Sequence, residues 1–205
     1  DLSEGIAGVE YTVDGITYLR EILSSHVDQT IAIRLTASKP GMINFDTELR
    51  GVRNSAHSNY ATDYFRMDGK GENELILTGK SADYMEIEGK LRYEARAQVH
   101  ANGGKIERDG TKIKVSNSNS ATILFVAATN FIDYKDVSGN EKASVQQYLE
   151  NLENKDYASI KNGALKDYKN LFERVELDLP STSTSFLPTD ERMKSIQTNP
   201  DPQMS

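Results

Sequence analysis

The sequence predicts a mainly β protein, with an antiparallel β-sandwich over residues 1–135 and a small helical linker with an extended tail over residues 136–205. Three observations support this prediction. Apolar and polar residues alternate with a period of two through most of residues 8–130. Asp-Gly pairs stand where tight hairpins need them. From Glu141 onward, apolar residues instead recur every three or four positions, which is the period of an amphipathic helix.

The first predicted strands form a hairpin. The runs VEYTV and ITYLREILSS are separated by Asp14-Gly15, a pair that readily adopts the positive φ angles of a type I′ turn. In the next run, TIAIRLTAS, Ile31, Ile33 and Leu35 alternate with small or polar residues, so we expect one buried face and one wet face. The turn sequence KPG then leads into another alternating strand, MINFDTELRG.

A polar segment, residues 52–73, has no clear period and is predicted to be a long loop. Five further strands are expected after it, in the runs ELILTGK, LRYEARAQVHA, KIERDG, TKIKVSN and ATILFVAATNF. The RDG sequence at 108–110 repeats the Asp-Gly hairpin signal. Residues 123–128 are continuously apolar, which predicts a strand that is covered on both faces.

Two amphipathic helices are predicted after the strands. The apolar stripe of the first consists of Val145, Tyr148, Leu149 and Leu152. The apolar stripe of the second consists of Ile160, Ala164, Tyr168, Leu171 and Val175. A hydroxyl-rich linker, PSTSTS, follows them and leads to a short helix that Thr189 is expected to cap.

Composition excludes several classes of function. The net charge is −7 and the pI is about 5.1, and no basic stripe is present, so nucleic acid is not an expected partner. The chain has no cysteine, which excludes disulfides, thiolate nucleophiles and cysteine-bound metals. No run of 18 apolar residues occurs, so no membrane span is predicted.

No catalytic residue is predicted within the chain. The histidines, His26, His57 and His100, are widely separated and have no companion serine motif, so each is interpreted as a loop or strand-surface residue. The glycines of DGKGEN lack the lysine-serine pair of a phosphate-binding loop, and no cofactor is predicted.

Metal binding is not predicted either. Asp63, Asp68 and Glu72 lie near glycines, but their spacing departs from that of a calcium-binding loop. Carboxylates in such a segment are usually solvated. Glu86 and Glu88 would share one face of a strand, where we expect them to be surface charges rather than the acid pair of a glycosidase.

The one candidate ligand contact is aromatic. Tyr60, Tyr64 and Phe65, in the polar segment, could stack against a sugar ring. The alternative interpretation is that they pack the segment onto the sheet. Tryptophan, the preferred stacking platform, is absent.

Several segments, in order, resemble the N-terminal region of the α-L-fucosidases of glycoside hydrolase family 95. They are DLSEGIAGVEYTVDGITYLREILSSHVDQTIAIRLTASKPG, LRYEARAQVHANGGKIERDGTKIKV and SATILFVAATNF. The most specific piece is LKDYKNLFERVELDL followed by LPTDERM, which is similar to the connection between the β domain and the catalytic domain of that family.

The resemblance implies a supersandwich-like domain, a helical linker and then an (α/α)6 barrel that hydrolyses terminal α-linked fucose with inversion. It places the catalytic glutamate and an asparagine-aspartate arrangement in the barrel, and none of those positions exists in this sequence. The chain is therefore expected to be inactive alone, with the barrel of the same parent chain as its partner and a fucosylated glycan as a ligand of the whole enzyme.

The resemblance also implies a bacterial enzyme, in the periplasm or secreted. It predicts further strands ahead of Asp1, so that the sandwich would be incomplete and leave an open edge or an apolar face. Two alternatives from other functional classes stay open. The chain could be a carbohydrate-binding module that uses residues 52–73, or a structural interaction domain.

Overall fold

The computed structural model describes residues 1–51, 65–83, 85–177, 181, 183–196, 198 and 201. The strands are β1 (Ile6–Val13), β2 (Ile16–Ser25), β3 (Thr30–Ala37), β4 (Ile43–Glu48), β5 (Phe65–Lys70), β6 (Glu74–Lys80), β7 (Arg92–Asn102), β8 (Lys105–Asp109), β9 (Lys112–Ser118) and β10 (Ser120–Thr129). The helices are α1 (Glu141–Leu152), α2 (Tyr157–Phe172), the 3₁₀ helix η2 (Ser183–Phe186) and α3 (Thr189–Ser195).

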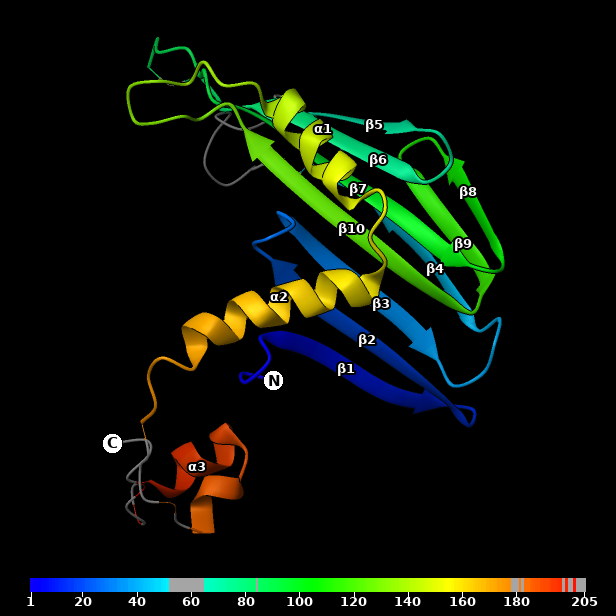
Figure 1. Ribbon diagram of the computed structural model, residues 1–205, viewed down its shortest axis with the longest axis vertical. Coiled ribbons are helices and arrows are strands. Elements are labelled where there is room, and N and C mark those ends of the chain that lie inside the picture. The colour runs from blue at the N-terminus through cyan, green and yellow to red at the C-terminus, as the bar shows by residue number, and fades with distance from the viewer. Residues whose placement is uncertain are drawn as a thin grey trace. The chain divides into compact units, whose positions relative to one another are not determined.

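The chain divides into two compact units, Asp1–Lys169 and Asn170–Ser205. The first unit contains two antiparallel sheets (Figure 1). The larger has the strand order β1-β2-β3-β10-β7-β6-β5, and the smaller has the order β4-β9-β8. The predicted fold class, mainly β with antiparallel sheets and C-terminal helices, is therefore confirmed. The predicted domain boundary at residue 135 stays a prediction.

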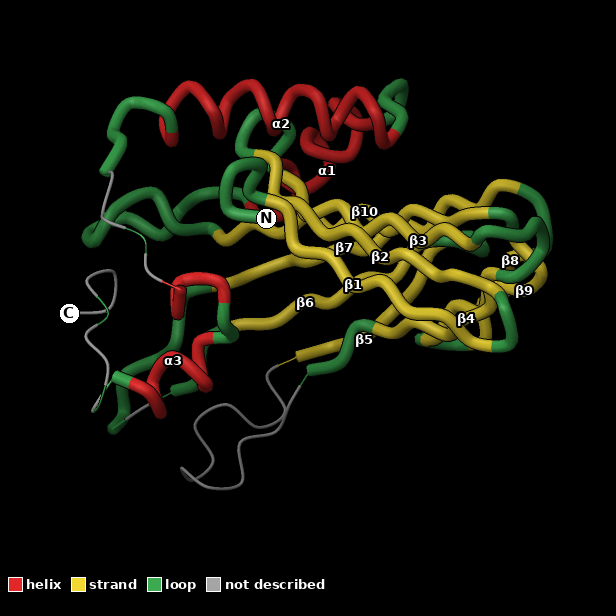
Figure 2. The backbone as a smooth tube through the Cα atoms, turned by 90° about the horizontal axis from the view of Figure 1, so that it is seen from below, coloured by secondary structure: helices red, strands yellow, loops and turns green. Residues whose placement is uncertain are grey.

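Helices α1 and α2 lie on the same side of the large sheet (Figure 2). A single hydrophobic cluster joins the sheet to both helices. The strands contribute Ile6, Leu23, Ala32, Leu124 and Val126. The helices contribute Val145, Leu149 and Leu152 of α1, and Ile160 and Ala164 of α2. The predicted stripe of α1 and the first half of the predicted stripe of α2 are thus confirmed as core.

The small sheet packs on the other face of the large sheet. Leu75 of β6 and Val99 of β7 form a second cluster with Ile113 and Val115 of β9. Strand β10 serves both clusters because its side chains alternate: Leu124 and Val126 belong to the first cluster, and the intervening residues pack against the second. The prediction of a strand covered on both faces is confirmed for residues 123–126, whereas Ala127 is exposed.

The structure corrects the prediction for residues 30–37. The face expected to be wet includes Ala32, which is fully buried under the helices, whereas Ile31 of the expected buried face is 39% exposed. The reason is that the large sheet is covered on both sides, but unevenly. At β1, an edge of that sheet, Val9, Tyr11 and Val13 are about half exposed.

The prediction of one long loop over residues 52–73 is also partly wrong. Residues 65–70 form strand β5, which pairs antiparallel with β6, from Phe65 opposite Gly79 to Lys70 opposite Glu74. The rest of the segment that was expected to be a loop, residues 52–64, lies outside the described residues. Glu86 and Glu88, which would have shared a strand face, lie in a connecting segment instead.

Both hairpins form at the predicted Asp-Gly pairs, but the second turn begins one residue later than predicted. Asp14 and Gly15 have φ angles of 51° and 70°, as a type I′ turn requires. In the second hairpin, Asp109 is the last residue of β8 and pairs with Lys112, so the two-residue loop begins at Gly110, whose φ is 58°. The strands predicted on either side of each turn are confirmed.

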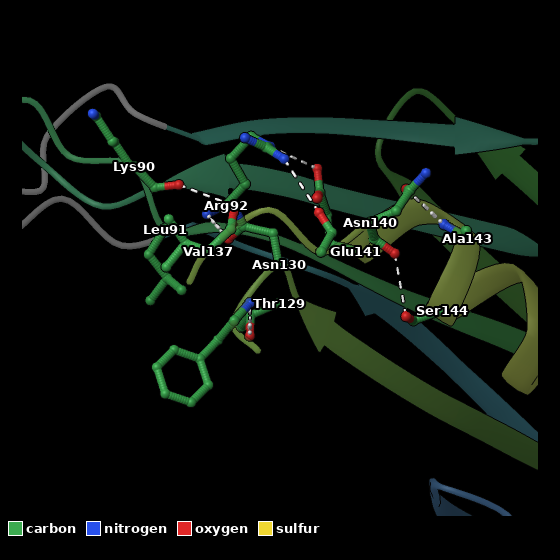
Figure 3. A network of polar contacts seen from close by, with 12 residues as sticks. Lys90, Leu91, Arg92, Thr129, Asn130, Val137, Asn140, Glu141, Ala143 and Ser144 are labelled. Carbon is green, nitrogen blue, oxygen red and sulfur yellow. Dashed lines mark hydrogen bonds and ion pairs between the residues drawn. The ribbon is translucent and has the colours of Figure 1, made fainter. Parts of the chain in front are cut away.

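A buried asparagine organises the connection from β10 to α1 (Figure 3). Asn130 is fully buried, and its Oδ1 accepts a hydrogen bond from the backbone N–H of Arg92 at 2.6 Å. Its Nδ2 donates to the carbonyl oxygens of Lys90, at 3.1 Å, and Val137. The connection ends at Asn140, whose side chain caps α1 by accepting from the N–H of Ala143 at 3.0 Å.

The second unit is held together by an ion pair. Arg192 of α3 donates to both carboxylate oxygens of Asp201, each at 2.8 Å, and Asp201 is buried. This bidentate geometry is the strongest form of the arginine–carboxylate contact. Thr189 does not cap α3 as predicted: the N-cap residue is Pro188, and no side-chain hydrogen bond is made there.

Among the described residues, no helix combines the length and the apolar character that crossing a membrane requires.

We expect Asn130→Ala to lower the free energy of unfolding by about 2–4 kcal/mol, because it removes a fully buried side chain and the three hydrogen bonds that it forms with partly buried backbone groups. Urea denaturation checks this value. The matched control is Asn151→Ala at an exposed position of α1, which should change stability by less than about 0.5 kcal/mol. Equal losses from the two variants would contradict the role given to Asn130.

Candidate functional site

The helix-facing side of the large sheet is polar where β3, β10, β7 and β6 lie next to one another. Two rows of side chains cross these strands in register. In the first row, Thr122 of β10 lies between Arg34 of β3 and His100 of β7. In the second row, Gln98 of β7 lies opposite Glu74 of β6. Charged and amide groups therefore occupy one continuous part of the sheet face.

A cavity of about 540 Å³ lies above this polar area, within the first unit. The sheet supplies its floor, and the second half of α1 and the start of α2 supply its walls. The wall residues include Gln146 and Glu150 of α1 and Asp156 and Tyr157 at the start of α2. Leu149 and Ile160, which belong to the hydrophobic cluster, add an apolar area beside the polar groups.

A charged network fixes one wall of the cavity. Arg96 donates to Glu94 at 2.7 Å and to Glu74 at 3.2 Å, and it also donates to Gln146 of α1 at 3.2 Å. Gln98 donates to the second oxygen of Glu74 at 2.7 Å. The side chains of Glu94, Glu74 and Arg96 are only 3%, 7% and 13% exposed. Two buried carboxylates thus depend on one guanidinium.

Arg34 is held differently. Its Nη1 donates to the hydroxyl of Thr122 at 2.7 Å, and its Nη2 donates to the hydroxyl of Ser120 at 2.8 Å. Its guanidinium carbon also lies 5.8 Å from the centre of the Tyr157 ring, in cation–π range. Within the described part of the chain, no carboxylate comes within ion-pair distance of Arg34, so neutral groups alone hold this partly buried cation.

Two ion pairs attach the start of α2 to the sheet. Lys155 contacts the buried Asp28 at 2.5 Å, and Ser25 donates to the same carboxylate at 2.6 Å. Lys161 contacts Glu21 of β2 at 2.7 Å. Tyr157 lies in the chain between these attachments. Its hydroxyl is buried and has no hydrogen-bond partner among the described residues.

The titration of two cavity residues is shifted. Burial raises the pKa of Tyr157 to about 12, with a further contribution from the charge of Glu21 and an opposing one from Arg34. Burial lowers the pKa of His100. His100 is therefore a neutral imidazole at pH 7, able to donate from one ring nitrogen and accept at the other.

The other histidines do not join the cavity. His26 is exposed and lies 4.0 Å from Asp167. His57 lies outside the described residues. Of the carboxylates compared with a calcium loop, Asp63 is also outside them, and Asp68 contacts its neighbour Arg66. No group of three or more metal-binding side chains occurs among the residues that the structure describes.

The predicted glycan contact stays a prediction. Tyr60 and Tyr64 lie outside the described residues. Phe65 begins β5, and its ring lies directly against the backbone of Gly51, where an added Cβ would come within 2.1 Å of it. This position of Phe65 agrees with the alternative interpretation, in which the aromatic residue packs within the domain.

Sequence reasoning missed the cavity, although a signal is present. In β7, Glu94, Arg96, Gln98 and His100 alternate with apolar residues, which is the usual pattern of a strand with a solvated face. The sequence does not reveal that α1 crosses above this face. Once the helix is in place, Gln98 and His100 line a cavity between the sheet and the helices.

We expect Arg96→Met to destabilise the protein by about 3–5 kcal/mol, because Glu74 and Glu94 would stay buried without a counter-charge. Denaturant titration measures the loss. Arg66→Met is the matched control, since Arg66 is 80% exposed and its pair with Asp68 is a surface one, worth less than about 1 kcal/mol. A loss below 1 kcal/mol for Arg96→Met would show that the buried Glu74 and Glu94 do not depend on Arg96.

We expect Tyr157→Phe to keep or slightly raise stability at pH 7, because it removes a buried hydroxyl that has no partner. Between pH 10 and 12, the unfolded chain releases the phenolic proton while the folded chain retains it, so the wild type loses stability as pH rises through this range. The variant should lose less. Urea denaturation at several pH values measures the stability of both proteins. An equal loss of stability in the wild type and in the variant would contradict the raised pKa of Tyr157.

Comparison with known proteins assigns the two ends of the chain to two families. Residues 1–134 match "Glycosyl hydrolase family 65, N-terminal domain", and residues 156–205 match "Glycosyl hydrolase family 95 catalytic domain". Over 233 aligned positions the chain is 28% identical to "Alpha-L-fucosidase 2" of Arabidopsis thaliana, an alignment that covers 100% of this chain and 26% of that protein.

A solved structure supports the fold. The chain is similar to "Putative kojibiose phosphorylase from human microbiome", with a TM-score of 0.52 and 15% sequence identity over 84% of this chain and 24% of the other. The chain thus spans about a quarter of the length of each of these two proteins. By its first 134 residues, the chain belongs to the family of glycosyl hydrolase family 65 N-terminal domains, and it continues into sequence of the glycosyl hydrolase family 95 catalytic domain.

Proposed function

We propose that this chain is the non-catalytic N-terminal part of an inverting α-L-fucosidase-type glycoside hydrolase, which cleaves terminal α-linked fucose from glycans. Its role is to pack against an (α/α)6 catalytic barrel of the same parent chain and to hold it in position. The match of residues 156–205 to a family 95 catalytic domain supports the link to such a barrel. The name of the Arabidopsis relative supports the choice of fucose.

One structural observation carries the positioning role. Ile160 and Ala164 lie in the segment that matches the catalytic domain, yet they belong to the same buried cluster as Leu23 and Ala32 of the sandwich. The first turns of α2 therefore share a core with the sheet. Lys155 and Lys161 add ion pairs on either side of Ile160. The start of the segment that matches the catalytic domain is thereby fixed to the sheet.

Exposed apolar residues support a partner for the second unit. Val175, Leu177 and Phe186 are 82%, 78% and 88% exposed. Large apolar side chains gathered in a short stretch at this level of exposure commonly mark a surface that another protein surface covers. A catalytic barrel in the same parent chain would provide such a surface.

We expect no independent hydrolysis from the carboxylates of this chain. An inverting glycosidase needs an acid and a base about 6.5–9.5 Å apart across the bound sugar, and the acid must be protonated. The cavity carboxylate Glu74 already accepts hydrogen bonds from Arg96 at 3.2 Å and from Gln98 at 2.7 Å, so both of its oxygens are engaged within the protein. We therefore expect the purified chain to release no fucose on its own.

The test is a chimera in which this chain replaces the aligned quarter of the Arabidopsis enzyme. We expect the folded chimera to release fucose from 2′-fucosyllactose, and Ile160→Asp to lower that rate at least about tenfold, because it breaks the shared core. Asn162→Asp, at an exposed position of the same helix, is the matched control. Thermal unfolding of each variant shows whether the domain itself stays folded.

Three results would overturn the proposal. The first is a rate that Ile160→Asp leaves unchanged. The second is fucose release by the isolated chain that disappears when one of its own carboxylates is replaced. The third is phosphate-dependent formation of a sugar phosphate from kojibiose by the parent enzyme, which would favour the phosphorylase activity named for the structural relative.

A further inference from the structure

We propose that the cavity between the large sheet and α1 binds a small neutral saccharide. The inference goes beyond the positioning role and does not depend on it. The volume of about 540 Å³ lies within the range of sites for small molecules, and it is far more than one or two ordered waters occupy. All the residues that line it belong to the first unit.

The charges of the lining favour a neutral ligand. Four carboxylates face three cations, and most of them are already engaged. Glu74 binds Arg96, Lys155 binds Asp28, and Asp156 accepts from the backbone of Ser159 at the start of α2. An anion would meet the surplus of carboxylates. A metal ion would find no cluster of ligands among the described residues.

The remaining hydrogen-bond capacity suits hydroxyl groups. Arg34 uses two of its five N–H groups on Thr122 and Ser120, and Gln98 donates to Glu74 while its own carbonyl oxygen is not engaged within the described residues. The neutral imidazole of His100 can both donate and accept, and it forms no hydrogen bond with the described residues. These donors and acceptors lie in adjacent rows of one sheet face.

The cavity also has the mixed character that a sugar ring requires. Leu124, Leu149 and Ile160 place apolar atoms beside these polar groups, where they can contact the C–H faces of the ring. The polar wall is preorganised, because the contacts of Arg96 with Glu74, Glu94 and Gln146 hold it before a ligand arrives. Little ordering of side chains would therefore accompany binding.

The test is a titration of the ¹⁵N-labelled 205-residue chain with 2′-fucosyllactose and, separately, with kojibiose, followed by NMR. We expect saturable shifts at millimolar concentration, confined to β7, β10, α1 and the start of α2. His100→Leu should weaken binding about tenfold, because it keeps the bulk and removes the polar contacts. His26→Leu, at an exposed position, is the matched control.

A second variant separates binding from folding. Glu150 is an exposed cavity residue on α1, so Glu150→Trp should obstruct the cavity and abolish the shifts while the spectrum stays that of a folded protein. No shifts with either sugar, shifts confined to other residues, or saturable binding of inorganic phosphate in place of sugar would overturn the proposal. An active chimera without any of these shifts would leave the positioning role standing alone.

Discussion

The hydrophobic cluster between the large sheet and helices α1 and α2 is the contact on which the rest of the structure depends. Leu124 and Val126 of the central strand β10 meet Val145 and Leu149 of α1 within it. Each side chain of this size stabilises the fold by roughly 1.5–3 kcal/mol when it is buried. The helices have 12 and 16 residues, which is marginal for isolated helices in water. They stay in place because the sheet covers their apolar stripes.

The packing around that cluster also buries polar groups that lie near it. Because α1 crosses the sheet, carboxylates that would otherwise be solvated are buried, and Arg96 must neutralise them through direct contacts. Arg34 is partly buried beside Tyr157 of α2 and is held by hydroxyl groups and not by a carboxylate. The packing of the helices on the sheet is thus accompanied by a buried charge network and by a row of polar groups with remaining hydrogen-bonding capacity.

The cluster also links the two families found in the chain. The sandwich belongs to one family, and Ile160 and Ala164, in the segment that matches the other, complete its core. Residues 156–169 of the second segment belong to the first unit, and Ile160 and Ala164 cannot leave the sheet without exposing apolar surface. The sandwich fold also occurs in a protein named for a different activity, so the fold alone does not specify the substrate.

Much of the secondary structure could be predicted from the sequence because its causes are local. Asp14 and Gly15 favour their turn regardless of what surrounds them, and the stripe from Val145 to Leu152 has a helical period in any context. Strand β5 escaped prediction because FRMDGK has no clear alternation; it forms because β6 offers it an unpaired edge. Thr189 does not cap α3 because the helix starts one residue earlier than predicted, with Pro188 at the N-cap position and Thr189 as its first residue.

The candidate site, too, could be predicted from the sequence only in part. The sequence by itself determined the order of strands and helices along the chain, and the alternation of polar and apolar residues within β7. Only the tertiary structure decided that His100 and Gln98 line a cavity beside α1, that Arg34 of β3 lies in a row with His100, and that Asn130 orders the connection to α1. The physical reason is that local pattern fixes which way a side chain points, whereas the strand order and the packing of helices fix what it meets there.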